Sequence, residues 1–294
     1  MQGAKRVVVP SVFCDLLLLT FIFLYDILFL LFMYCAYNER KSIMKEQYKK
    51  ILETEYKRKT IFQHLIDGKF TVSRAYEGNE YKNSNCKLMV VGRAMNGWEK
   101  DFSKLKVDEI INMIFEEGFD FNDVINPDLS QKYNNCSYNY IRSKFWKLIK
   151  FVLEEYNDAN TNWYDIEKND KWNEKIVWSN LYKISPKEAG NPPWKIMMQN
   201  IEEYINILKE EIEEYNPDRI LLVTDNNYLE PDVKKPTFIE AFNIIKCEKG
   251  NIVGVGKYRD KKVIVCKRPD RWGMSDDKIR EMAREIKAEF DTFE

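Results

Sequence analysis

The chain has 294 residues, and its 46 Lys and Arg residues against 47 Asp and Glu give a formal net charge of -1. This balance excludes a strongly basic protein that coats nucleic acid through its overall charge. Apolar residues make up 45% and charged residues 32% of the chain, which excludes a disordered chain, a collagen-like repeat and a coiled-coil array. We expect a packed globular domain, present as a monomer, with a sizeable core.

The cysteine and histidine content argues against a metal centre. The six cysteines are scattered without a Cys-x-x-Cys pair or a close Cys/His spacing, so we expect neither a disulfide framework nor a zinc site. The one histidine, His64, lies in a segment of helical pattern, and we interpret it as a structural or surface residue. We therefore expect no metal and no cofactor.

Residues 7–37 form a nearly continuous apolar segment that is long enough to span a bilayer, since about 20 apolar residues suffice. More basic residues follow this segment than precede it, so the positive-inside rule predicts that an inserted segment leaves the rest of the chain in the cytoplasm. The alternative is a wrongly assigned translation start, because Met44 opens a sequence of ordinary soluble composition. Both interpretations separate a hydrophobic segment, 1–43, from a single cytoplasmic domain, 44–294.

Helical and strand patterns alternate along that domain. Amphipathic periodicity predicts helices over 44–67, 137–156, 199–215 and 275–290. Short apolar runs predict buried strands over 87–92, 174–183, 219–225 and 261–267, the last preceded by a hairpin turn at 259–262. The alternation predicts a three-layer α/β/α sandwich with a short, mainly parallel four-stranded central sheet.

In such sheets a ligand lies beyond the carboxyl ends of the strands. This rule selects four loops, namely 93–98, 183–194, 224–228 and 268–272. Gly92 precedes the first loop, where its small size lets a ligand approach the backbone. The fourth loop combines Arg268, Arg271 and Trp272, and such a cluster can hold phosphates and stack on bases. Its alternative interpretation is surface salt bridges beside a core tryptophan.

Asn180, at the end of the second predicted strand, has the most specific chemistry. An asparagine amide offers both a carbonyl acceptor and amide donors, which is what reading the edge of a nucleobase requires. The alternative is that Asn180 caps the turn or ties neighbouring loops together.

Taken together, these loops resemble the uracil-DNA glycosylase superfamily, and most closely its iron–sulfur bacterial branch. The strongest part is NLYKISPKEAGNPP (180–193), followed by a helix and then PDRILLVT (217–224). KLMVVGRAMNGW (87–98) stands where the family has its first motif, and VIVCKRPDRW (263–272) where it has its last.

The resemblance implies hydrolysis of the N-glycosidic bond of a flipped, damaged or modified base in single- or double-stranded DNA. It implies catalytic roles for Asn96, Asn180 and Arg268. It implies substrate contacts, including the phosphate contacts of the basic residues, for Gly92, Arg93, Ala94, Met95, Trp98, Lys183, Asn191, Pro269, Arg271 and Trp272.

The chain departs from the family pattern at several positions. Ala94 stands where many members have Asp or Asn, Arg93 where the iron–sulfur branch has Glu, and Arg268 where members have His; the cluster cysteines are absent. Either Asn96 or a more distant acid, Asp225 or Asp270, then handles the water, or no base is excised.

The alternative function is therefore a non-catalytic module of the same fold that recognises a modified base, a nucleotide or a nucleic-acid end. A third hypothesis is an unrelated small-molecule hydrolase that uses the same strand ends. A carboxylate close to the site favours catalysis, whereas a site lined only by Asn180, Arg93 and Arg268 favours binding.

Overall fold

The computed structural model describes residues 11–57, 69–95, 101–117, 143–159, 171–187, 190–229, 237–269 and 273–292. Contacts between Cα atoms divide the chain into two compact units, Met1–Met44 and Lys45–Glu294, and we describe each unit by itself.

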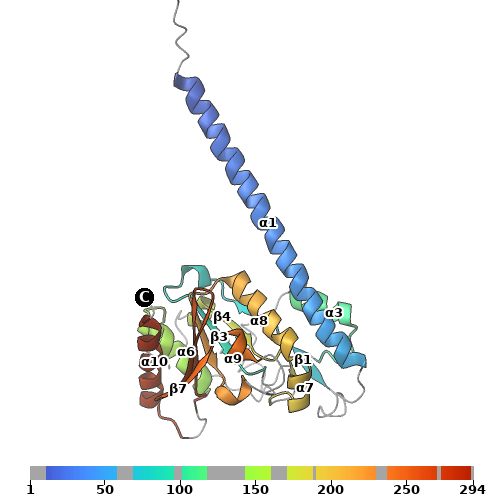
Figure 1. The fold of residues 1–294 in the computed structure, drawn as a ribbon, viewed down its shortest axis with the longest axis vertical. Helices are drawn as coiled ribbons and strands as arrows, with labels where there is room; N and C mark the ends of the chain where they lie inside the picture. The colour runs from blue at the N-terminus through green and yellow to red at the C-terminus, as the bar shows by residue number, and fades with distance from the viewer. Residues whose placement is uncertain are drawn as a thin grey trace, which may run out of the picture. The chain divides into compact units, whose positions relative to one another are not determined.

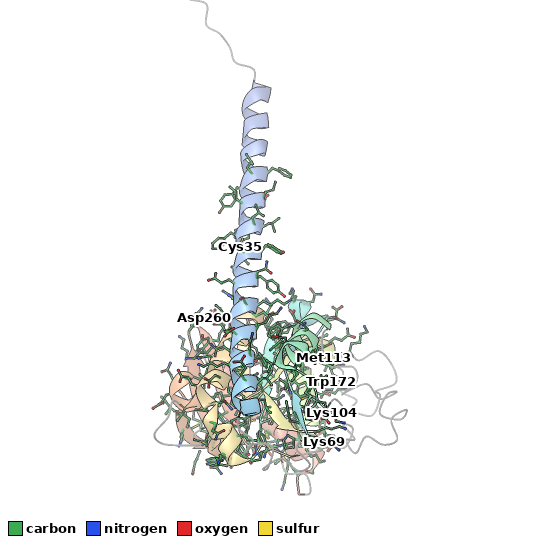
Figure 2. The ribbon with its side chains drawn as sticks, turned by 90° about the vertical axis from the view of Figure 1, so that its right-hand side faces the viewer. Cys35, Lys69, Lys104, Met113, Trp172 and Asp260 are labelled. Atoms are coloured by element: carbon green, nitrogen blue, oxygen red, sulfur yellow. The ribbon has the colours of Figure 1, made fainter. Side chains whose placement is uncertain are left out.

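The first unit is dominated by the long helix α1 (Ser11–Lys57). Its large apolar side chains between Ile22 and Tyr37 are exposed, and Figure 2 shows them projecting outward around Cys35. By length and composition, the described segment Ile22–Glu53 is able to cross a membrane. A helix of this kind near an N-terminus is compatible with a membrane anchor and with a signal sequence.

The second unit contains a mixed sheet with the strand order β2-β4-β3-β6-β9-β8-β7. These strands are β2 (Tyr76–Glu77), β3 (Leu88–Gly92), β4 (Ile176–Asn180), β6 (Arg219–Val223), β7 (Ile245–Lys249), β8 (Ile252–Tyr258) and β9 (Lys261–Cys266). Strands β4, β3, β6 and β9 are neighbours and run parallel, whereas β2, β8 and β7 add antiparallel pairs at the two edges. A separate two-stranded sheet pairs β1 (Phe70–Val72) with β5 (Ile184–Pro186).

The predicted α/β class is confirmed, but the sheet is larger and more mixed than predicted. It has seven described strands rather than four, and three of its six strand pairings are antiparallel. Strand β2 is only two residues long, which is too short to give a periodic pattern. Strand β7 has the sequence IKCEK and is largely exposed, so it lacks the apolar run of a buried strand.

Short and long helices connect these strands (Figure 1). The α-helices of the second unit, apart from the end of α1, are α3 (Val107–Asn112), α6 (Lys144–Glu155), α7 (Trp194–Gln199), α8 (Ile201–Tyr215), α9 (Phe238–Ala241) and α10 (Asp276–Asp291). The 3-10 helices are η2 (Tyr81–Asn83), η5 (Trp172–Lys175) and η6 (Asn226–Tyr228), and η3 (Met113–Glu117) is a π-helix.

The two faces of the sheet pack against different helices because successive strand residues point to opposite faces. On one face, Trp178 of β4 belongs to a buried apolar cluster with side chains of α6 and α10, which lie side by side in Figure 1. On the other face, the hydroxyl of the next residue, Ser179, donates a hydrogen bond to Glu211 of α8. Helices therefore cover both faces.

Local signals explain where these helices begin and end. The hydroxyl of Ser143 accepts a hydrogen bond from the Trp146 backbone N–H at the start of α6, and Ser275 does the same for Lys278 at the start of α10. Helix α8 ends at Asn216, whose φ of 45° is left-handed, and Pro217 then prevents continuation. The end of α8 therefore leads directly into the amino end of β6.

Candidate functional site

The carboxyl ends of the four parallel strands bring several predicted site residues to one edge. Gly92 ends β3 and pairs in register with Asn180, which ends β4. Val223 ends β6 and pairs with Cys266 of β9, so Asp225 and Arg268 follow at the same edge. Since β4 and β6 lie on opposite sides of β3, this edge contains the switch point at which open α/β sheets bind ligands.

Asn180 is only 3% exposed and lies against the backbone of Gly92. A Cβ atom added to Gly92 would stand 2.7 Å from the side-chain oxygen of Asn180 and 3.7 Å from Cζ of Phe145. A glycine is therefore needed here to admit the amide. Among the residues that the structure describes, none forms a hydrogen bond with this amide. The donor and acceptor groups of this amide are therefore available to a ligand.

The alternative interpretation, that Asn180 ties the neighbouring loops together, finds no support in the described contacts. The loops after β3 and β4 are joined through their backbones: the Leu181 N–H donates to the Gly92 carbonyl and the Tyr182 N–H to the Arg93 carbonyl, both at 2.9 Å. The Asn180 side chain is not required for this connection.

Asp225 links three of the selected loops. Its Oδ2 accepts a hydrogen bond from the Arg93 guanidinium, and its Oδ1 accepts one from the Arg268 backbone N–H at 3.1 Å. Its φ of 57° is uncommon for a residue other than glycine, and its own N–H donates to the Cys266 carbonyl at 3.2 Å. A residue held in such a conformation is typical of functional sites.

The Arg93 guanidinium is fixed from three sides. Besides its ion pair with Asp225, its Nε donates to the Thr224 carbonyl at 3.0 Å, and it stacks 3.9 Å from the centroid of the Tyr228 ring. The Tyr228 hydroxyl accepts a hydrogen bond from Nδ2 of Asn191 at 3.0 Å, so Asn191 of the loop 183–194 joins the same group. Sequence reasoning selected the loop 224–228 but gave Tyr228 no role, because a single aromatic residue in a polar loop has no distinctive pattern.

The Asp225 side chain is 31% exposed, so a carboxylate at this edge reaches solvent. A carboxylate has about four acceptor sites, and the described contacts use one on each oxygen. Asp225 therefore keeps acceptor capacity for a water molecule or a ligand. Burial raises the pKa of the neighbouring Cys266 thiol, which argues against a thiolate nucleophile at the end of β9.

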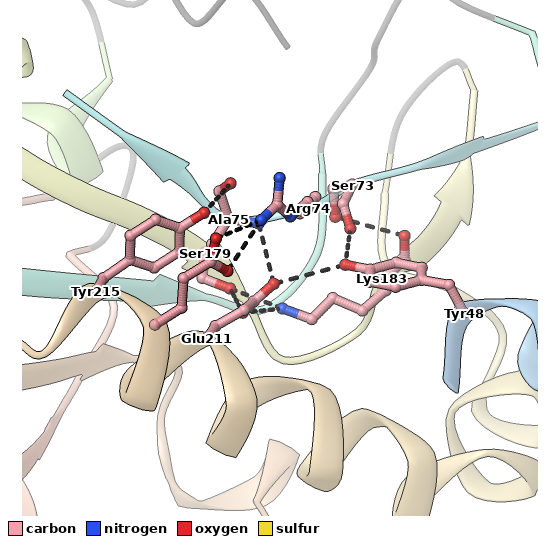
Figure 3. A network of polar contacts seen from close by, with 9 residues as sticks. Tyr48, Ser73, Arg74, Ala75, Ser179, Lys183, Glu211 and Tyr215 are labelled. Carbon is pink, nitrogen blue, oxygen red and sulfur yellow. Dashed lines mark hydrogen bonds and ion pairs between the residues drawn. The ribbon is translucent and has the colours of Figure 1, made fainter. Parts of the chain in front are cut away.

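The predicted phosphate contact of Lys183 is wrong, because this side chain is fully buried against Glu211 of α8 and does not lie at the carboxyl edge of the sheet (Figure 3). Its Nζ lies 2.6 Å from Oε2 of Glu211 and 2.7 Å from Oγ of Ser179. Burial lowers the pKa of the Lys183 ammonium, although the Glu211 carboxylate opposes this shift. The chain turns after Asn180 so that Lys183 points toward α8 and not toward the strand ends.

The other predicted residues have mixed placements. Met95 packs in the apolar cluster with α6, Pro269 is buried, and Ala94 is half-buried. Arg268 is exposed at the end of β9. Asn96, Trp98, Asp270, Arg271 and Trp272 lie outside the described residues, so their roles stay predictions. Among the described residues, no group of three or more His, Cys, Asp and Glu side chains could hold a metal ion.

No protein-family model matches the chain, and no curated protein is significantly similar to it. The residues at the strand ends therefore carry the functional evidence.

Proposed function

We propose that the second unit binds a nucleobase at the carboxyl edge of its sheet and hydrolyses the N-glycosidic bond of a flipped base in DNA, as a divergent relative of the uracil-DNA glycosylases. One observation carries this proposal: the buried Asn180 amide has no described hydrogen-bond partner, and an acidic residue, Asp225, stands at the same edge. An amide recognises the edge of a base, and a carboxylate activates water.

The fold supports the proposal. The four strands that carry the family-like motifs are the four adjacent parallel strands, and helices cover both faces of the sheet. This arrangement agrees with a three-layer α/β/α sandwich whose parallel core is extended at its edges by β2, β8 and β7.

Each residue at the edge has its own role in the proposed reaction. The Asn180 amide donates to a base carbonyl and accepts from a ring N–H, and Gly92 leaves room beside it. Neighbouring strands are about 4.8 Å apart, so the ends of β4 and β6 are about 10 Å apart, which accommodates a base and a water molecule. The water oxygen bonds to the sugar C1′, and Asp225 takes a proton from this water. The C1′–N bond breaks, and the departing base keeps the electron pair of this bond. The base then receives the proton that Asp225 took from the water.

The test uses the full-length protein in detergent micelles with single- and double-stranded oligonucleotides that contain uracil, hypoxanthine or alkylated bases. Abasic sites are scored by strand cleavage in alkali. We expect Asn180→Ala to lower base release about 10²- to 10³-fold, because it removes hydrogen bonds to the charge that develops on the base. Base release that is equal in the variant and in the wild-type protein would exclude Asn180 as the recognition residue.

A second variant separates the position of the amide from its chemistry. Gly92→Ala keeps Asn180 but puts a Cβ atom 2.7 Å from its oxygen, so it should displace the amide and also lower base release. The thermal melting temperature of both variants is measured in parallel, because the loss of activity is informative only where the fold is retained.

A non-catalytic recognition module of the same fold is the second candidate. It is favoured by the ion pair at the site, because each Asp225 oxygen already has a hydrogen-bond donor, Arg93 or the Arg268 N–H. Oligonucleotide binding that requires Asn180, without any release of a base, would assign this function.

We also propose that α1 anchors the domain to a membrane with residues 44–294 in the cytoplasm, on the strength of its exposed apolar segment. The full-length protein should remain in the membrane fraction after an alkaline carbonate wash, and a chain that starts at Met44 should be released. A full-length protein in the soluble fraction would contradict the anchor, and a native chain that lacks the apolar segment would indicate either a cleaved signal sequence or translation from Met44.

A further inference from the structure

The first residue of α7 presents an aromatic side chain to solvent. Trp194, which follows Pro192 and Pro193, is 51% exposed. The tryptophans Trp146, Trp172 and Trp178, in contrast, are buried in the apolar core. Outside α1, only Trp194 and Ile245 are large apolar side chains with comparable exposure in the described part of the chain. An exposed indole gains little free energy from burial, so folding does not explain why Trp194 is a tryptophan.

The loop that leads into Trp194 is tied to the candidate site. Nδ2 of Asn191 donates to the Tyr228 hydroxyl, and the Tyr228 ring lies beneath the Arg93 guanidinium. The Tyr182 hydroxyl donates to the Tyr228 carbonyl at 2.6 Å, which fixes this contact from a second side. Two consecutive prolines also restrict the backbone before Trp194. The backbone that carries the indole is therefore restrained, so binding through Trp194 loses little backbone entropy.

The next residue, Lys195, supplies a positive charge. It is exposed, and none of the ion pairs described for this chain involves it. Lys147, in contrast, is paired with Asp276. Trp194 and Lys195 are consecutive and both exposed, so this end of α7 offers the two groups that bind single-stranded nucleic acid, namely a stacking surface for a base and a cation for its phosphate.

We propose that Trp194 and Lys195 form a second binding site for a nucleotide of single-stranded or locally unpaired DNA, next to the base that Asn180 reads. The inference rests on the nucleic-acid binding in the proposed function but not on base excision. Single strands fit better than duplexes, because an indole stacks only on an exposed base face and the net charge of -1 does not favour duplex coating.

The test measures binding of the full-length protein in detergent to a fluorescein-labelled oligothymidylate and to a matched duplex. We expect Trp194→Ala to weaken single-strand binding about 5- to 150-fold and Trp194→Phe to retain most of it, since phenylalanine keeps a stacking face. Lys195→Ala should reduce the slope of log affinity against log salt by about 0.7. Ile245→Ala, at the other exposed apolar position, is the matched control and should bind like the wild-type protein.

Several outcomes overturn this inference. One is that Trp194→Ala binds the single-stranded oligonucleotide as tightly as the wild-type protein does. Another is that Trp194→Ala weakens binding only to vesicles of phosphatidylcholine and phosphatidylserine, which would make the indole a membrane contact. Failure of the proposed reaction is distinguishable: if no base is released but binding still requires Trp194, the nucleotide site stands. If Asn180→Ala abolishes base release but Trp194→Ala binds normally, the nucleotide site is wrong and the proposed reaction stands.

Discussion

Replacing Glu211 with alanine is expected to lower the free energy of unfolding by about 3–5 kcal/mol, because it leaves the Lys183 ammonium buried without its counter-charge. Both residues are fully buried, and Oε2 of Glu211 also accepts from the Ser179 hydroxyl at 2.6 Å. Oε1 accepts from the Ala75 N–H at 3.0 Å and is 3.5 Å from the Tyr48 hydroxyl (Figure 3). Urea denaturation of the full-length protein in detergent, followed by tryptophan fluorescence, measures the change.

Two variants make this prediction specific. Glu213 is on the same helix, and its partner Arg259 is largely exposed, so Glu213→Ala should cost less than about 1 kcal/mol. The double variant Lys183→Met with Glu211→Leu should recover most of the stability, because apolar residues of similar volume often replace a buried ion pair without loss. A Glu211→Ala variant as stable as Glu213→Ala would show that the network does not stabilise the fold.

The buried pair of Lys183 and Glu211 was not predicted from the sequence. Glutamates on an amphipathic helix usually lie on its solvated face, but Glu211 lies at helical spacing from Leu208 and Tyr204, which are buried. Lys183 lies in a stretch of buried residues from Ile176 to Ser185. A charged residue on each apolar surface is a signal for a buried pair. The pairing itself joins residues 28 positions apart, so only the folded chain identifies it.

The parts predicted from sequence were those with a local cause. Continuous apolar runs are enough to identify parallel strands that are buried on both faces, and the end of each run locates Gly92, Asn180 and Arg268. The edge strands β2 and β7 lack such runs. The ion pair between Arg93 and Asp225 depends on the strand order, which places the loops after β3 and β6 side by side. Sequence spacing does not contain that information.

Asp225→Asn is expected to lower base release about 10²- to 10⁴-fold, because an amide cannot take a proton from the attacking water. The substitution keeps the size of the side chain and an oxygen that can accept from the Arg268 N–H. The loops after β6 and β9 should therefore stay joined, and binding to an oligonucleotide should be largely retained. Abasic-site formation and affinity are measured on the same preparation.

Asp291→Asn is the matched control. Asp291 is also a partly exposed carboxylate paired with a cation, Lys287. It accepts a hydrogen bond from the Tyr156 hydroxyl. The Tyr156 ring in turn stacks with Arg219, which lies at the amino end of β6. It therefore lies at the opposite edge of the sheet and should not affect release. If Asp225→Asn loses binding together with release at an unchanged melting temperature, the carboxylate acts by holding Arg93. Release at the wild-type rate would instead exclude Asp225 as the base, because the amide has no basic oxygen to replace it.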